Sequence, residues 1–388
     1  MNEKLCSQLS LEEIAAQFQQ EVNDLANAST AGAPATPILV EPLDWFSSVG
    51  HRFIRLRVSH GIAGTPSYTS GKLYGIDISS AAAVVALGVE ASDHVLDLCC
   101  APGAKLSMIS DALVCAERAV DAGDEGPFAG SVTGVDIASA RLSACRTLCK
   151  KYELGNVRLF LDDACVFNCL APPVRHLRAK GVPATDANKT LPEPVFPSDL
   201  TLNLPESLTR VPEIAAKSKR AMAKRNEVIL DHLFFTSNWT ICSVASELYD
   251  KVLVDAQCTL DASIRHLLRY NKVGWIDFEG NPSQVISELQ KKMIFNAFRL
   301  LKPGGSLVYS TCSFCTAQNE DVITWLQQHE PSAEVAPIAW PAKFAVNISP
   351  GHIPHTVRFY PKHSGTSGMF IAKVIKRNTG TSSSTRSE

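Results

Sequence analysis

Segments that favour strands alternate with segments that favour helices along much of this chain, and this alternation constrains the fold more than any other feature. Strands are predicted at 95–98, 131–135, 157–161, 251–258, 306–312 and 369–375, and helices at 79–87, 105–116, 138–151 and 288–301. This order specifies an α/β fold with a doubly wound, mostly parallel, Rossmann-like sheet. The carboxyl ends of parallel strands share one edge of the sheet, where active sites are found.

The regions outside the alternation divide the chain further. We expect a helix and linker in 1–36, a small N-terminal α/β extension in 37–75, the main domain in 76–376 and a disordered tail in 377–388. Ser10 and Glu13 have the spacing of a capping box at the start of the first helix. A series of prolines disfavours regular structure within 165–248. We interpret this segment as an insertion, because the alternation resumes at Lys251.

Composition and charge exclude several classes of protein. The 388 residues are 45% hydrophobic and 20% charged, as in a soluble enzyme, and no apolar run reaches the ~20 residues of a membrane helix. The net charge of −2 does not indicate nucleic acid, so any basic surface must be local. The first residues lack a secretory signal, and twelve scattered cysteines do not suggest a disulfide framework. We expect an intracellular monomer in a reducing compartment, the nucleus, nucleolus or cytoplasm.

A short loop of small residues follows the first parallel strand. The loop Cys99–Lys105 contains a Pro-Gly turn and leads into a helix, whose first N–H groups and dipole favour an anionic group. The next strand ends at Asp136, which is placed to bind ribose hydroxyls or to cap the helix that starts at Ala138. A nicotinamide dinucleotide would need Gly-x-Gly-x-x-Gly, which this loop lacks. The carboxylate of S-adenosylmethionine suits it better.

Two cysteines differ from the others because both end predicted strands at the active-site edge. Cys258 follows Asp255 by three residues, and Cys312 ends the strand after Gly305. This arrangement favours nucleophilic catalysis. Cys312 and Cys315 form a C-x-x-C pair, but no second pair at a zinc spacing accompanies it, so we predict no metal site. Seven others are interpreted as small buried hydrophobes: Cys6, Cys115, Cys145, Cys149, Cys165, Cys169 and Cys242.

The segments VLDLCCAPGAKL, DKVLVDAQCT and GGSLVYSTCSFCTAQNEDVI together resemble motifs of the Sun (Nop/Sun, RsmB-like) family of RNA cytosine-carbon-5 methyltransferases. VLDLCCAPGAKL is similar to the family loop D-x-C-A-A-P-G-G-K, and DKVLVDAQCT is similar to D-x-V-L-x-D-A-P-C-S. GGSLVYSTCSFCTAQNEDVI resembles G-G-x-L-V-Y-S-T-C-S-x-x-x-x-E-N-E-x-V-V. The entry segment PLDWFSSVGHRFIRLRV and the closing segment RFYPKHSGTSGMFIAKV also match, so the resemblance covers most of 42–376 in order.

The resemblance implies a methyltransferase that modifies cytosine in tRNA or rRNA with S-adenosylmethionine, without a metal or a membrane. It implies that Cys312 is the nucleophile, that Cys258 helps to release the product, and that Asp255 and Lys105 line the reacting base. The implied cofactor-binding residues are Cys99, Cys100, Ala101, Pro102, Gly103, Ala104, Lys105, Asp136, Arg141, Asp163 and Asp255.

The chain departs from the family pattern at three positions. Gln257 replaces the proline before Cys258, Ala104 replaces a glycine, and Gln318 replaces an acidic residue. Gln257 supports an alternative, an RNA-binding assembly factor on a methyltransferase scaffold with little turnover. DNA cytosine methylation uses the same chemistry, but there the nucleophile is the Pro-Cys cysteine, whereas here the Thr-Cys strand is the intact one.

Basic residues suggest where RNA would bind. Arg265, His266 and Arg269 follow Cys258 and are the favoured RNA contacts. Lys217–Arg225 holds five Lys or Arg residues, and either a solvated basic segment or a set of phosphate contacts explains it. A third group, Arg52, Arg55 and Arg57, alternates along a predicted strand, which is more typical of an exposed strand face.

Overall fold

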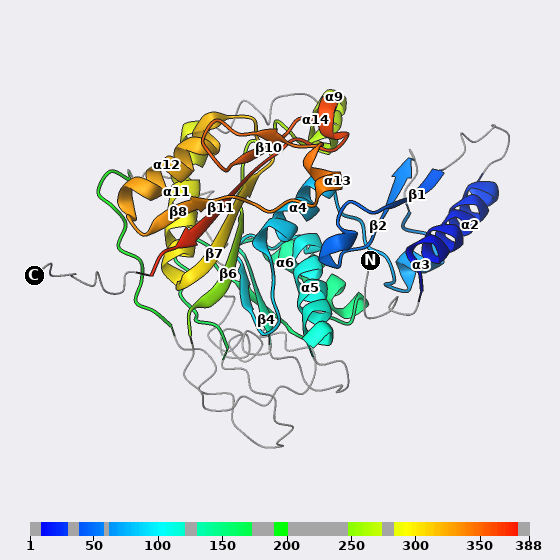
Figure 1. Cartoon of the computed structure of the whole chain (residues 1–388), viewed down its shortest axis with the longest axis horizontal. Helices are drawn as coiled ribbons and strands as arrows, with labels where there is room; N and C mark the ends of the chain where they lie inside the picture. The colour runs from blue at the N-terminus through cyan, green and yellow to red at the C-terminus, as the bar shows by residue number, and fades with distance from the viewer. Residues whose placement is uncertain are drawn as a thin grey trace, which may run out of the picture.

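A computed structural model describes residues 9–29, 39–57, 62–120, 130–172, 190–200, 247–273 and 283–378. A nine-stranded sheet forms the centre of the described part, in the order β5-β4-β3-β6-β7-β11-β10-β9, with β8 paired to β11 (Figure 1). The parallel strands are β3 (His94–Asp97), β4 (Ser131–Asp136), β5 (Val157–Leu161), β6 (Tyr249–Asp255) and β7 (Leu301–Thr311). The antiparallel strands are β8 (Ala333–Ala336), β9 (Ser349–Pro350), β10 (Val357–Phe359) and β11 (Met369–Lys376). The predicted doubly wound, mostly parallel fold is therefore confirmed.

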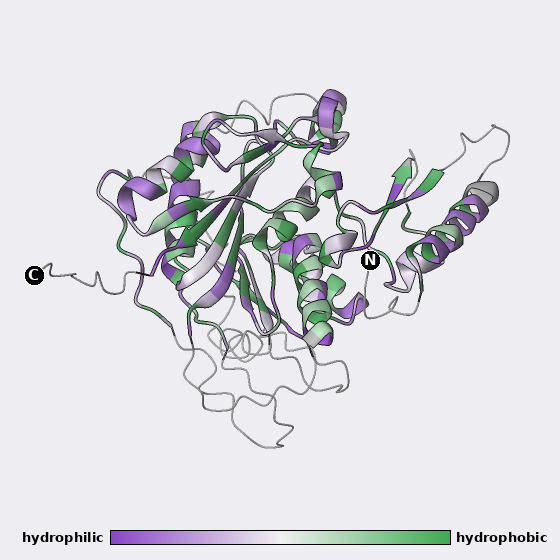
Figure 2. Ribbon diagram, viewed as in Figure 1, coloured by the Kyte–Doolittle hydropathy of each residue, from purple (hydrophilic) through white to green (hydrophobic). Residues whose placement is uncertain are grey.

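Helices cover both faces of this sheet, and the apolar strands lie between them (Figure 2). One apolar core packs beneath α4 (Ile78–Leu87), α5 (Ala104–Val120) and α6 (Ser139–Lys151). The other packs beneath α11 (Ser283–Leu300) and α12 (Glu320–His329). Four shorter helical elements are also present in the described part: α9 (Ile264–Val273), η3 (Thr316–Gln318), α13 (Ala342–Ala345) and α14 (Pro361–Ser364). Because β3, β6 and β7 are parallel, their carboxyl ends meet at one edge.

A small N-terminal unit stands beside the sheet, next to α4 and α13 in Figure 1. It consists of α2 (Leu11–Ser29), the antiparallel pair β1 (Leu39–Leu43) and β2 (Phe53–Arg57), η1 (Ser47–Val49) and α3 (Pro66–Thr69). The predicted capping box is confirmed, since Ser10 N donates to Glu13 Oε2 at 2.7 Å and Glu13 N donates to Ser10 Oγ at 3.1 Å. Phe18 of α2 is fully buried and packs in one apolar cluster with Val40 of β1. This cluster attaches the helix to the two-stranded sheet.

The predicted strands and helices of 79–161 lie within a few residues of the observed ones. Sequence reasoning did not place α9, α12 or strands β8–β10. Most of the predicted insertion lies outside the described residues, as do the tail beyond 378 and the linker at 30–36. Within the described part, an isolated bridge pairs Ala171 with Glu247, so the two ends of the insertion meet beside β6.

Candidate active site

The loop between β3 and α5 carries backbone N–H groups to the carboxyl edge of the sheet. Cys100 N donates to Val135 O at 3.0 Å, which fixes the loop against β4. Gly103 has φ +111°, and a Cβ there would meet Leu148 and Cys145 at 3.2–3.4 Å. This position therefore needs glycine, both for its backbone conformation and for its close approach to α6. The first turn of α5 presents N–H groups at this edge, as the sequence predicted.

Asp136 and Arg141 hold the same loop from the side of β4. Asp136 Oδ2 accepts Ala101 N at 3.2 Å, and Oδ1 accepts Ala138 N at 2.9 Å at the start of α6. Arg141 Nη2 donates to Ala101 O at 2.5 Å and lies 3.7 Å from Asp136 Oδ2. Asp136 therefore binds the N–H of Ala138, the residue before α6, but no side chain caps the first turn of that helix, so the carboxylate positions the loop rather than the helix. A contact between Asp136 and a ribose stays a prediction, and the Asp136 side chain is only 3% exposed.

Lys105 and Asp255 form an ion pair between α5 and the end of β6. Lys105 Nζ lies 2.7 Å from Asp255 Oδ2, and Ser310 Oγ donates to Asp255 Oδ1 at 2.7 Å. The side chains are 14% and 28% exposed, so the pair is shielded from bulk water yet reachable. Burial alone would lower the pKa of Lys105, but the Asp255 carboxylate outweighs burial and raises it. Lys105 is thus held as a cation at this edge.

Two thiols meet next to this ion pair. Cys258 Sγ and Cys312 Sγ are 3.3 Å apart. Cys312 directly follows β7 and is half-buried, whereas Cys258 is buried and lies three residues beyond the end of β6, not within the predicted strand. The Cys258 thiol, and then burial, raise the pKa of Cys312, while Lys105 opposes that rise. In the free chain Cys312 is therefore a thiol, and it must lose a proton before it can act as a nucleophile.

Two glutamines stand where the family pattern has other residues. Gln257 is exposed, and its carbonyl accepts Gln290 Nε2 at 2.7 Å from α11. Gln318 is fully buried, and its Oε1 accepts Thr259 N at 3.0 Å. The loop that carries Cys258 is thus fixed on both sides, and neither departure separates Cys258 from Cys312.

Asp97 is a site residue that sequence reasoning did not single out. It ends β3, is 1% exposed, and neither carboxylate oxygen has a hydrogen-bond partner within the described residues. Burial, and then the nearby Asp255 carboxylate, raise the pKa of Asp97 to about 7. The sequence signal that could have indicated Asp97 is the aspartate at the start of the family loop pattern. Ser310 was missed as well, because nothing in its sequence context distinguishes it from other strand serines.

The predicted RNA contacts lie on α9, which begins six residues after Cys258. Arg265 is exposed, and His266 Nδ1 lies 2.8 Å from Ser263 Oγ. Helix α9 adjoins the thiols through the bond from Ala262 N to Cys312 O at 3.0 Å. The side chain of Arg269 and the whole of Lys217–Arg225 lie outside the described residues.

The remaining predicted residues are positioned by local contacts. Asp163 follows β5, and its Oδ1 accepts Cys165 N at 2.8 Å. Arg55 pairs with Glu41 Oε2 at 2.6 Å, and Arg52 Nη1 donates to Leu9 O at 2.7 Å. The Arg57 side chain is outside the described residues. Of the arginines predicted on an exposed strand face, Arg55 is exposed, whereas Arg52 is half-buried and binds back to the N-terminal unit.

The described ranges contain no cluster of three or more His, Cys, Asp or Glu side chains that could hold a metal ion. None of the helices described here is long and apolar enough to cross a membrane.

Comparison with known proteins shows which proteins the chain is similar to. A family model described as 16S rRNA methyltransferase RsmB/F matches residues 204–375, a stretch that includes both thiols. Over that stretch the chain resembles this RsmB/F-like Sun family. Among curated proteins, a tRNA (cytosine(49)-C(5))-methyltransferase of Pyrococcus abyssi is 30% identical over 138 residues, which is 33% of this chain and 42% of that protein. Ribosomal RNA small subunit methyltransferase B of Klebsiella pneumoniae is 31% identical over 132 residues, 34% of this chain and 27% of that protein. The chain thus aligns with less than half the length of these relatives.

Solved structures are similar to this chain in fold. NSun6 from Pyrococcus horikoshii with SFG has a TM-score of 0.51 at 18% identity, over 85% of this chain and 62% of that one. A methyltransferase homolog protein from the same organism also has a TM-score of 0.51, at 20% identity, over 92% of this chain and 82% of that one. At these identities the likeness concerns the fold alone.

Proposed function

We propose that this chain methylates carbon 5 of cytosine in RNA, with S-adenosylmethionine as the methyl donor. The observation that carries the proposal is the pair of thiols 3.3 Å apart beside the Lys105–Asp255 ion pair. The names of the relatives support it, because they describe cytosine-C5 methylation of tRNA and methylation of small-subunit rRNA. The target is therefore proposed to be tRNA or rRNA.

The edge residues fit S-adenosylmethionine, which carries a sulfonium, an ammonium and a carboxylate. Carboxylates gather at the ends of β3, β4 and β6, and the two free oxygens of Asp97 suit a cationic group. The first turn of α5 suits the carboxylate. We propose that loop 99–105, Asp136, Arg141 and Asp163 hold the cofactor. When bound, it supplies an electrophilic methyl group.

Cys312 supplies the nucleophile in the proposed reaction. A lone pair of its thiolate would form a bond to carbon 6, and the electron pair of the carbon 5–carbon 6 double bond would become available at carbon 5. That pair would form the new bond to the methyl group, while the pair of the broken methyl–sulfur bond stays on the donor sulfur. A base then removes the carbon 5 proton, that bonding pair restores the double bond, and the pair of the sulfur–carbon bond returns to Cys312. Covalent catalysis of this kind divides a difficult step into easier ones.

The neighbours of Cys312 have separate roles in this scheme. Lys105 favours the thiolate electrostatically, against the effect of burial. Asp255 is held by Lys105 and Ser310, so its orientation toward a bound base is fixed before the base arrives. We assign Cys258 to product release, because its sulfur is the nearest thiol to the adduct. The base must be unstacked for Cys312 to approach its face.

The test is methyl transfer from labelled S-adenosylmethionine to total cellular RNA, followed by digestion to nucleosides. Wild type should yield labelled 5-methylcytidine, and Cys312→Ala should yield none. Cys315→Ala is the matched control, since Cys315 is a half-buried cysteine of the same loop and should leave transfer intact. Labelled 5-methylcytidine from Cys312→Ala would overturn the assigned nucleophile. No transfer by wild type to any RNA, with cofactor binding retained, would favour the assembly-factor alternative.

A further inference from the structure

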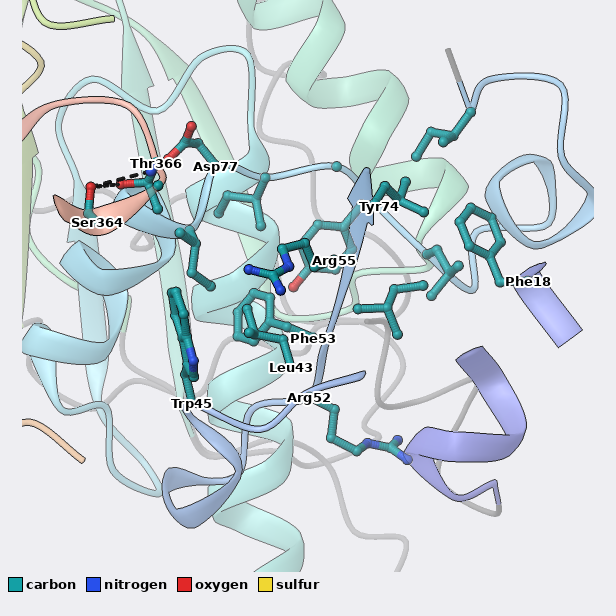
Figure 3. Close-up of a pocket in the computed structure, with 18 residues that line it drawn as sticks. Phe18, Leu43, Trp45, Arg52, Phe53, Arg55, Tyr74, Asp77, Ser364 and Thr366 are labelled. Atoms are coloured by element: carbon teal, nitrogen blue, oxygen red, sulfur yellow. Dashed lines mark hydrogen bonds between the residues drawn. The ribbon is translucent and has the colours of Figure 1, made fainter. Parts of the chain in front are cut away.

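A cavity lies between the N-terminal unit and the main sheet (Figure 3). Its volume is about 360 Å³, within the ~300–1,000 Å³ typical of ligand sites. The lining comes from β1, β2, the segment before α4, and the segment after α14. Aromatic side chains form part of the wall, with Trp45 and Tyr74 half-buried and Phe53 buried. None of these residues belongs to the site described above.

Two segments of the cavity wall lie at the same edge of the sheet as the two thiols. Helix α4 precedes β3 and α14 precedes the antiparallel β11, so the start of α4 and the end of α14 both lie at the carboxyl edge of β3 and β7. A chain of backbone contacts links the two places. Gly368 N donates to Ala262 O at 2.8 Å, and Ala262 N donates to Cys312 O at 3.0 Å. Thr366, in the cavity wall, is only two residues from Gly368, at most about 7 Å of chain.

Arg55 provides a positive charge within the cavity. In Figure 3 its guanidinium points from β2 toward Trp45 and Asp77, whereas Arg52 points away toward α2. Its side chain is 44% exposed. Glu41 accepts bonds from Arg55 Nε and Nη2, at 3.0 and 2.6 Å, and a guanidinium has five N–H donors, so donors remain for a second acceptor. The Asp77 oxygens already accept Ser79 N and Ser367 N.

We infer that this cavity binds one nucleotide of the RNA substrate, close to the target cytosine along the strand. Single-stranded RNA is held by stacking of its bases on aromatic rings and by cationic contacts to its phosphates. Trp45 offers the ring and Arg55 the cation, in a space of nucleotide size. The target base must leave its stack to reach Cys312, so a neighbouring nucleotide held here fixes the strand while the base turns out. This inference rests on the proposed RNA substrate.

The first test measures binding of a short fluorescein-labelled single-stranded RNA of mixed sequence over a series of salt concentrations. Arg55→Gln should weaken binding and reduce the slope of log affinity against log salt by about 0.7, the value for one phosphate contact on a single strand. Arg377→Gln is the matched control, because Arg377 is also exposed and paired with a carboxylate, Glu334, but lies at the opposite end of β11. Equal slopes for the two variants would overturn the inference.

The second test maps contacts directly, by ultraviolet cross-linking of the same RNA to the full chain and mass spectrometry of the peptides. A nucleotide attached within 45–55 is the expected result, and Trp45→Leu should lower affinity about fivefold or more, the effect of losing one stacked base. Cross-links confined to α9 or to other segments would overturn the inference. Neither readout requires turnover, so a chain that binds RNA in the cavity but transfers no methyl group would contradict only the proposed function.

Discussion

Replacing Asp255 with asparagine tests whether the Lys105–Asp255 pair holds the active-site edge together. Asparagine keeps the shape and the acceptor for Ser310 but leaves Lys105, at 14% exposure, as a shielded cation without its partner. At a separation of 2.7 Å the attraction is about 6 kcal/mol for an effective dielectric constant of about 20. Removing one partner of a buried pair costs about 3–5 kcal/mol. Because Asp255 is 28% exposed, we expect the lower end of that range.

For a domain of about 300 residues, with an unfolding entropy of about 2.1 cal/mol/K per residue, a loss of about 3 kcal/mol corresponds to a fall of about 5 °C in the thermal midpoint. The assay is thermal and urea unfolding of the chain without cofactor. Asp44→Asn is the control, since its partner Lys343 is 70% exposed and Asp44 is 53% exposed, and it should change little. Adding Lys105→Met to Asp255→Asn should recover part of the loss, because no unpaired cation remains. The reasoning is refuted if Asp255→Asn behaves like Asp44→Asn, or if the double variant is less stable than Asp255→Asn alone.

Three further outcomes are expected. Cys258→Ala should accumulate a covalent protein–RNA adduct on a denaturing gel, because addition at Cys312 proceeds while release is impaired; an adduct-free gel beside an active wild type would remove Cys258 from release. Hydrogen peroxide should join the thiols of Cys258 and Cys312, 3.3 Å apart, into a disulfide with reduction of the peroxide to water. Transfer activity should fall and return with dithiothreitol, and persistence of both free thiols in alkylation mapping would contradict this. Because burial and then Asp255 raise the pKa of Asp97 to about 7, the ionised form is disfavoured in the folded chain, and stability should fall by up to about 4 kcal/mol as the pH rises from about 4 to 7. Asp97→Asn should abolish that decline. The thermal midpoint of the variant minus that of wild type should therefore increase over this pH range. A difference that stays constant with pH would contradict a raised pKa of Asp97.

The sheet could be predicted from the sequence because its strands carry strong local signals. Residues 131–136 are all buried, and 157–161 begin with three buried residues, so both read as apolar runs between helices. The placement of Cys312 followed from the same logic, since it comes directly after the long strand β7. Likewise, the Ser10–Glu13 capping box is a contact over three residues and is visible in the sequence itself.

Other features depend on contacts between distant segments and have no local signal. Strands β8 and β10 are only four and three residues long and form because β11 offers both of its edges. The cavity is built from β1, β2 and the ends of two helices more than 280 residues apart, so no window of sequence contains it. Arg55 illustrates the point, because alternation along β2 predicts only that it is exposed, and the cavity appears once residues 364–366 close the opposite wall.

Gln257 and Gln318 show how this chain can depart from the Sun-family pattern at two positions and still keep the two thiols together. A proline before Cys258 would fix the backbone through its ring. Here the carbonyl of Gln257 is held instead by Gln290, a fully buried side chain of α11, at 2.7 Å. On the other side of Cys258, Gln318 binds Thr259 N at 3.0 Å, and Tyr309 Oη donates to Gln318 O at 2.6 Å. Hydrogen bonds with α11 and η3 therefore hold this loop in the absence of the proline ring, and Cys258 Sγ lies 3.3 Å from Cys312 Sγ.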